Sequence, residues 1–139
     1  MADTMRSPQS GSVGAPVHRV DARAKVTGGA AYVDDLSFPG MLQAALVLPG
    51  AAHARLRGID ARAALELPGV RAVLTAADIP GENQVGVVQS DQPLLPHDRI
   101  RYSGDAPAVV VADTAPRARE AAGLVRLDLE ELPGVFDAE

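Results

Sequence analysis

The sequence predicts an α/β (α+β) fold in which short helices pack on a mixed sheet. Strand-sized apolar runs and helical segments intermingle along the 139 residues, and Pro and Gly separate them. No segment of 20–50 residues repeats, which excludes a repeat architecture. About 47% of the residues are apolar and 22% are charged, as expected for one globular domain and not for a disordered chain.

The first residues differ in composition from the rest. Residues 1–16 are rich in Ser, Pro, Gly and Gln and have no periodic apolar pattern, which predicts a flexible lead before a domain at 17–139. Over residues 17–40 we expect extended chain with turns, because Gly and Pro are frequent there. The expected turns lie at 27–29 and 39–40, with a short extended piece at 30–33 between them.

Two strands are predicted in the middle of the chain. Residues 41–48 form a near-continuous apolar run that Pro49 and Gly50 end, which is typical of a central strand covered on both faces. Residues 70–74 read as a second strand, and a turn at 77–81 follows it.

A short helix is predicted between these strands. Asp60 can accept a hydrogen bond from a first-turn N–H of a helix over 61–67, and Pro68 and Gly69 end it. So short a helix requires packing for its stability.

The last third of the sequence predicts a strand–helix–strand unit. Residues 106–112 are a strand, 114–122 a helix with Pro116 in its first turn and Gly123 at its end, and 124–129 a strand. One helix is thereby expected to pack on a sheet.

The segment 81–99 is polar, interrupted by Pro and long for a loop inside a compact domain. Such loops often contact a ligand or a partner, so this loop is the best interface candidate. Its amides Asn83 and Gln84 could orient a partner, although polar side chains are ordinary in loops.

Charge and aromatic content bear on the class of partner. The net charge is −5, and acidic residues exceed basic ones chiefly in the last twenty residues. A nucleic-acid-binding surface requires the opposite sign, and two Tyr, two Phe and no Trp offer little base stacking. The absence of Cys removes thiolate nucleophiles and thiolate ligands of zinc or iron–sulfur clusters.

No membrane segment is predicted. The longest apolar runs are strand-sized, far below the roughly 20 residues of a membrane helix, and the first residues lack the apolar core of a secretory signal. We therefore expect a cytoplasmic protein.

The residues that most often carry chemistry form no recognisable site. His18, His53 and His97 lie in separate segments without the spacing of helical metal ligands, and Asp34 and Asp35 are adjacent, so an extended chain points them to opposite faces. No Ser lies in a G-x-S-x-G turn, and no phosphate-binding G-K-[ST] is present. We predict no catalytic, cofactor-binding or metal-ligating residue in this chain.

The order of short motifs carries more information. They include K-V-T-G at 25–28, Y-V-D-D at 32–35, A-H-A-R at 52–55, L-P-G-V at 67–70, D-Q-P-L at 91–94 and R-Y-S-G at 101–104. With these motifs, residues 17–139 resemble the N-terminal α/β hammerhead domain of the xanthine dehydrogenase/aldehyde oxidase family. One departure is Asp105, where the family often carries Gln.

The resemblance implies a structural part of a molybdenum hydroxylase that inserts a water-derived oxygen at a C–H carbon of a purine, aldehyde or N-heterocycle. It implies molybdopterin, 2Fe-2S and FAD in the assembly, none of them bound by this chain alone. The implied partners are a molybdopterin-binding large chain or domain and iron–sulfur and FAD subunits. The family's catalytic residues lie after this domain, so none is carried over here.

Two alternatives remain open from the sequence. One is a free-standing binding or regulatory module that reuses the fold and holds a ligand in the 81–99 loop. The other is a small hydrolase in which folding brings Asp34, Asp35 and His53 together. A scaffold separated from its assembly should expose an apolar patch and self-associate, whereas an autonomous module should not.

Overall fold

The structure is a computed structural model that describes residues 18–86 and 88–137. The chain divides into two units, Met1–Phe38 and Pro39–Glu139. The lead predicted at 1–16 lies outside the described residues. Within the described part of the chain, no helix combines the length and the apolar character needed to cross a bilayer.

The first unit contains a short helix that the sequence pattern did not predict. Helix α1, Ala22–Val26, lies where only extended chain and turns were expected. It is stabilised locally: Lys25 Nζ lies 2.9 Å from Asp21 Oδ2, and the Thr27 hydroxyl donates to the carbonyl of Arg23 at 2.8 Å. No residue of α1 is buried, so the helix has no apolar stripe that a sequence pattern could reveal.

The rest of this unit agrees in part with the prediction. The turn after α1 is present and Gly28 adopts a φ of 72°, in the left-handed region that favours glycine. Tyr32 is extended, but Val33–Asp35 form a 3-10 turn, η1, instead of continuing the extended piece.

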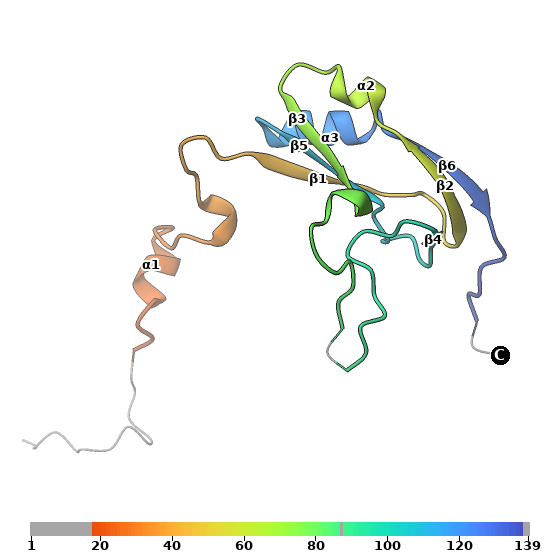
Figure 1. The fold of residues 1–139 in the computed structure, drawn as a ribbon. Helices are drawn as coiled ribbons and strands as arrows, with labels where there is room; N and C mark the ends of the chain where they lie inside the picture. Colours follow the sequence, from red (N-terminus) through yellow and green to blue (C-terminus); the bar gives the residue numbers. More distant parts are fainter. Residues whose placement is uncertain (1–17, 87, 138–139) are drawn as a thin grey trace, which may run out of the picture. The chain divides into compact units, whose positions relative to one another are not determined.

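The second unit is built on two three-stranded antiparallel sheets (Figure 1). The first sheet has the order β1-β5-β3 and the second β4-β2-β6. The strands are β1 Gln43–Val47, β2 Ala54–Asp60, β3 Val70–Thr75, β4 Arg99–Ile100, β5 Ala108–Ala112 and β6 Arg126–Glu131. Short helices pack on a sheet, so the predicted α/β (α+β) class is confirmed.

Strand β1 is present, but its predicted central position is wrong. It lies at an edge of the first sheet, and β5 is the central strand. Its residues alternate between the two faces, with Val47 buried and Leu46 58% exposed. The run is apolar on both sides although only one side is covered within the described residues.

Strand β2 was not predicted, although it is the central strand of the second sheet. Ala54 and Leu56 are buried and Arg55 and Arg57 are exposed, which is ordinary strand alternation. The register against β6 shifts between Leu56 and Gly58, which marks a β-bulge. The bulge breaks the period of two within a seven-residue strand, so the regular stretch is too short to detect in the sequence.

The two predicted helices of this unit are present. Helix α2 covers Arg62–Leu65, shorter than predicted, and the backbone N–H of Arg62 donates to Asp60 Oδ1 at 3.1 Å. Helix α3 covers Ala115–Ala122, and the Thr114 hydroxyl accepts from the N–H of Arg117 at 3.5 Å. After α3 the chain enters β6, which belongs to the second sheet and not to the sheet that contains β5.

The core lies where α2 and α3 pack on one face of the first sheet. Its buried members are small and aliphatic: Val47, Ala64, Ala108, Val110, Ala121 and Val125. Ala118 and Ala121 are the buried residues of α3, and their small side chains let the helix approach the strands closely. Gly69, with a φ of 91°, makes the turn from α2 into β3.

Candidate interaction surface

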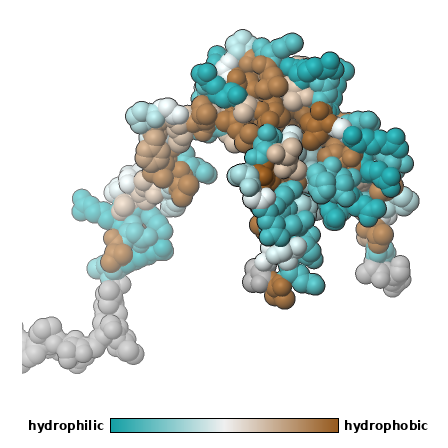
Figure 2. Space-filling view, in the orientation of Figure 1, coloured by the Kyte–Doolittle hydropathy of each residue, from teal (hydrophilic) through white to brown (hydrophobic). Residues whose placement is uncertain are grey.

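The uncovered face of the first sheet is the most distinctive surface of the second unit. Strand pairing places Leu46, Val109 and Leu74 in one row across β1, β5 and β3. A second row contains Ala44, Val111 and Ala72. We call these six residues the open apolar face. Figure 2 shows apolar surface over this sheet.

This face contrasts with the one that α3 covers. The neighbouring row of Val47 and Ala108 is buried, whereas Leu46 is 58% and Leu74 is 40% exposed. Because side chains alternate along a strand, both faces of β1 and β5 are apolar but only one forms core. A contiguous apolar sheet face without charge is typical of a surface that another domain or chain covers.

Hydrogen bonds join the two ends of the 81–99 loop. Asn83 makes two hydrogen bonds with the backbone of Leu95, at 2.7 and 3.0 Å, and Val85 and Gln92 form an isolated antiparallel bridge. Asn83 therefore holds the loop together from within. The Gln84 Oε1 atom is buried and has no hydrogen-bond partner among the described residues.

The histidines and adjacent aspartates are engaged locally or exposed. The Nδ1 atom of His53 lies 2.8 Å from the carbonyl oxygen of Pro133, which joins the start of β2 to the segment after β6. Asp35 Oδ2 accepts from the backbone N–H of Tyr32 at 3.0 Å, and His18 is exposed. His97 Nδ1 lies 4.0 Å from Asp98 Oδ1. Over 18–86 and 88–137, no three His, Asp or Glu residues are grouped so that they could hold a metal ion.

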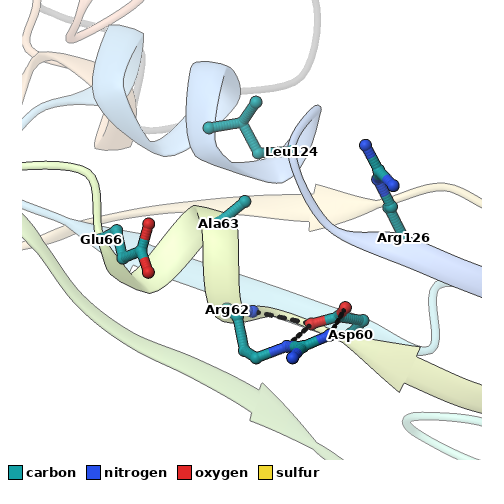
Figure 3. A pocket seen from close by; sticks show the side chains of 6 residues that line it. All are labelled: Asp60, Arg62, Ala63, Glu66, Leu124 and Arg126. Atoms are coloured by element: carbon teal, nitrogen blue, oxygen red, sulfur yellow. Dashed lines mark hydrogen bonds and ion pairs between the residues drawn. The ribbon is translucent and has the colours of Figure 1, made fainter.

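A shallow pocket of about 320 Å³ lies where β2 passes into α2 (Figure 3). Asp60 turns toward Arg62, whose Nη2 donates to Asp60 Oδ2 at 2.7 Å, and Arg126 and Glu66 lie on the rim. The hydrogen bonds from Arg62 hold the pKa of Asp60 far below its ordinary value. This carboxylate remains ionised and paired at neutral pH, so it is a poor general base.

Asp105 has a structural role that its sequence context did not reveal. Its side chain is 7% exposed, and its Oδ2 accepts from the backbone N–H of Arg101 at 2.7 Å. The backbone N–H of Asp105 donates to the carbonyl of Tyr102 at 3.1 Å, which closes a turn at 103–104. The carboxylate that stands here in place of the family's Gln therefore accepts a hydrogen bond from the backbone of this same chain.

Comparisons with known proteins identify relatives of this chain. The chain is 44% identical over 114 residues to a probable xanthine dehydrogenase subunit of Bacillus subtilis (strain 168), an alignment that covers 82% of this chain and 15% of that protein. It is 40% identical over 121 residues to the nicotinate dehydrogenase large molybdopterin subunit of Eubacterium barkeri, covering 87% and 28% of the two chains.

Solved structures agree with the fold. The aldehyde oxidoreductase from Desulfovibrio gigas superposes with a TM-score of 0.79 at 38% identity, over 83% of this chain and 14% of that one. The chain thus spans only a small part of the relatives it matches, 28% or less of the two curated proteins. Residues 27–133 match the family model described as aldehyde oxidase and xanthine dehydrogenase, a/b hammerhead domain, and the chain belongs to that family.

Proposed function

We propose that this chain is the hammerhead domain, or a separately encoded small subunit, of a xanthine dehydrogenase-like molybdenum hydroxylase. Its role is structural, and it is not catalytic alone. The observation that carries the proposal is the open apolar face. The chain matches only 15% of a much longer relative, and an exposed apolar sheet face is suited to burial against the rest of such an enzyme.

The occupant of this face is a molybdopterin-binding chain or domain of the same enzyme. The face carries no charged side chain, so it recognises shape and apolar character. Within the open apolar face, Leu46 and Leu74 are the large side chains that remain most exposed. One relative is named as a large molybdopterin subunit, which supports this partner.

Other parts of the enzyme bind its cofactors. The donor set does not fit a 2Fe-2S cluster, because the sequence has no Cys to supply thiolates. Molybdopterin, FAD and the iron–sulfur clusters are held by other domains or subunits of the enzyme. The reaction class is oxidative hydroxylation of a purine, aldehyde or N-heterocycle in the cytoplasm, and its substrate is selected elsewhere in the enzyme.

A free-standing binding module is the alternative, and one observation favours it. Gln84 lines a pocket of about 460 Å³ together with Asn83 and His97, and its buried Oε1 has no hydrogen-bond partner among the described residues. This alternative predicts a monomer whose binding depends on the loop and not on the open apolar face.

The experiment is an affinity pull-down of the tagged chain from its native cells, with partners identified by mass spectrometry and molybdenum measured in the eluate. The wild-type chain should recover a large molybdopterin-binding chain in stoichiometric amount together with molybdenum. The double variant Leu46→Glu/Leu74→Glu should reduce recovery at least about tenfold, because two carboxylates would be desolvated in the interface.

Leu65→Glu is the matched control, since Leu65 is an exposed leucine of α2 outside the open apolar face. It should leave recovery unchanged. A metal-free monomer from the wild-type chain would overturn the proposal and favour the alternative. Recovery of the large chain that survives Leu46→Glu/Leu74→Glu would reject this face as the docking surface.

A further inference from the structure

The second sheet carries a concentration of arginines on its outer side. Ala54 pairs with Ile100 and both are buried, so the next pair, Arg55 and Arg99, lies on the opposite, exposed side. Arg101 follows Ile100 and is exposed like Arg99. We call the following residues the basic face: His53, Arg55, Arg57, Arg99 and Arg101.

Acidic residues of the second sheet form ion pairs with only some of the arginines of the basic face. A single carboxylate oxygen, Glu130 Oε2, lies 2.8 Å from Arg57 Nη2 and 3.8 Å from Arg55 Nε. The Arg57 hydrogen bond lowers the pKa of Glu130, so this carboxylate is charged and already engaged. No ion pair joins the guanidinium of Arg99 or Arg101 to an acidic residue of β2, β4 or β6 within the described residues.

Arg55 and Arg99 are directly opposite residues of the antiparallel strands β2 and β4. Directly opposite residues of antiparallel strands have their Cβ atoms roughly 5 Å apart, and like charges there repel. An anionic group between the two guanidiniums would convert this repulsion into attraction on both sides. The arrangement is therefore better suited to a bound carboxylate than to a free surface.

A pocket of about 320 Å³ adjoins the same side chains. His53, Arg99 and Arg101 line it together with Val135 and Phe136, which are 90% and 85% exposed. The pocket thus combines cationic and apolar walls. A peptide segment in which carboxylates flank an apolar side chain would complement both kinds of wall.

We propose that the basic face docks an acidic segment of a partner protein, with carboxylates against Arg55, Arg99 and Arg101 and an apolar side chain against Val135 and Phe136. A nucleic acid fits less well, because the chain carries a net charge of −5 and has only two Tyr and two Phe for stacking. This face is separate from the open apolar face, so the inference stands independently of the proposed function.

The test uses the full chain and fluorescence anisotropy with a short labelled peptide of glutamates that flank one phenylalanine. The peptide should bind at low salt and more weakly at physiological ionic strength. Arg99→Glu/Arg101→Glu should weaken binding at least about tenfold, since each lost charge-assisted contact is replaced by repulsion. The control Arg117→Glu/Arg119→Glu makes the same change of net charge at two exposed positions of α3, outside the basic face, and should bind like the wild-type chain.

A second readout separates binding from mere surface charge. Arg99→Gln should raise the Tm of the free chain by about 1–5 °C, because it removes the repulsion with Arg55, and it should also weaken peptide binding. Replacing phenylalanine by serine in the peptide should weaken binding further. The proposal is overturned if Arg99→Glu/Arg101→Glu leaves peptide affinity unchanged, or if a single-stranded DNA or inorganic phosphate competes as well as the peptide.

Discussion

Asp105 illustrates how a single buried carboxylate can fix a loop. It accepts from the N–H of Arg101 and closes the turn that starts at Tyr102, so it connects the end of β4 to the start of β5. The sequence motif identified this position as a departure from the family pattern but contained no information on its partner. A hydrogen bond across four residues of irregular chain has no periodicity for a sequence pattern to reveal.

The first prediction concerns this side chain. Asp105→Ala should lower the free energy of unfolding by about 1–3 kcal/mol, because the partly buried hydrogen bond from the backbone N–H of Arg101 to a carboxylate is lost. Asp105→Asn keeps an acceptor oxygen and should cost less. Urea unfolding followed by circular dichroism measures both, and Asp91→Ala, at an exposed aspartate, is the control. Equal stability of Asp105→Ala and the wild-type chain would contradict the assigned role.

Acid sensitivity is the second prediction. Hydrogen bonds from Arg71 lower the pKa of Asp113, and those from Arg57 lower that of Glu130. A carboxylate whose pKa is lower in the folded than in the unfolded chain stabilises the fold above its unfolded pKa of about 4. That stabilisation is lost as the pH falls through the folded pKa. The urea midpoint should therefore stay flat from neutral pH to about pH 5 and fall below about pH 4.

Asp113→Asn tests the origin of this dependence. The variant should be less stable than the wild-type chain at neutral pH and should lose less stability on acidification, because one shifted carboxyl group is gone. Glu120→Gln, at an exposed position of α3, should retain the wild-type profile. If Asp113→Asn also retains it, the Arg71 pair does not contribute.

At the scale of elements, the sequence predicted the strands and helices that have clear ends and a regular period. Gly123 ends α3 as expected, whereas Thr114, predicted as the first residue of this helix, is the capping residue before it. The bulged β2 and the five-residue α1 were not predicted, since one breaks its period and the other has no buried residue. The central position assigned to β1 was wrong because an apolar run shows which faces of a strand are apolar and not how many strands pair with it.

The third prediction uses adjacent residues of β1 that point to opposite faces. Val47→Thr places a hydroxyl in the core and should cost about 1–3 kcal/mol of unfolding free energy. Leu46→Thr lies on the open apolar face and should change it by no more than about 0.5 kcal/mol. Urea unfolding of the two variants decides the matter. Similar losses in both would mean that the open apolar face is covered by this chain itself.

At the scale of the whole molecule, the second unit presents two faces of different chemistry. The open apolar face lies on the first sheet and the basic face on the second. The family could be predicted from the order of motifs, but neither face could. Each face depends on strand register, which joins residues distant in sequence, such as Leu46 with Val109 and Arg55 with Arg99.

The last prediction follows from the open apolar face. The isolated chain should self-associate as its concentration rises, because apolar surface without its partner finds a second copy. Sedimentation velocity should show Leu46→Glu/Leu74→Glu as a monomer at concentrations where the wild-type chain is oligomeric. Added salt should not dissociate the wild-type oligomer, since screening weakens charge pairs and leaves apolar contacts intact. Arg99→Glu/Arg101→Glu should associate like the wild-type chain. A wild-type chain that stays monomeric at every concentration would instead identify an autonomous module.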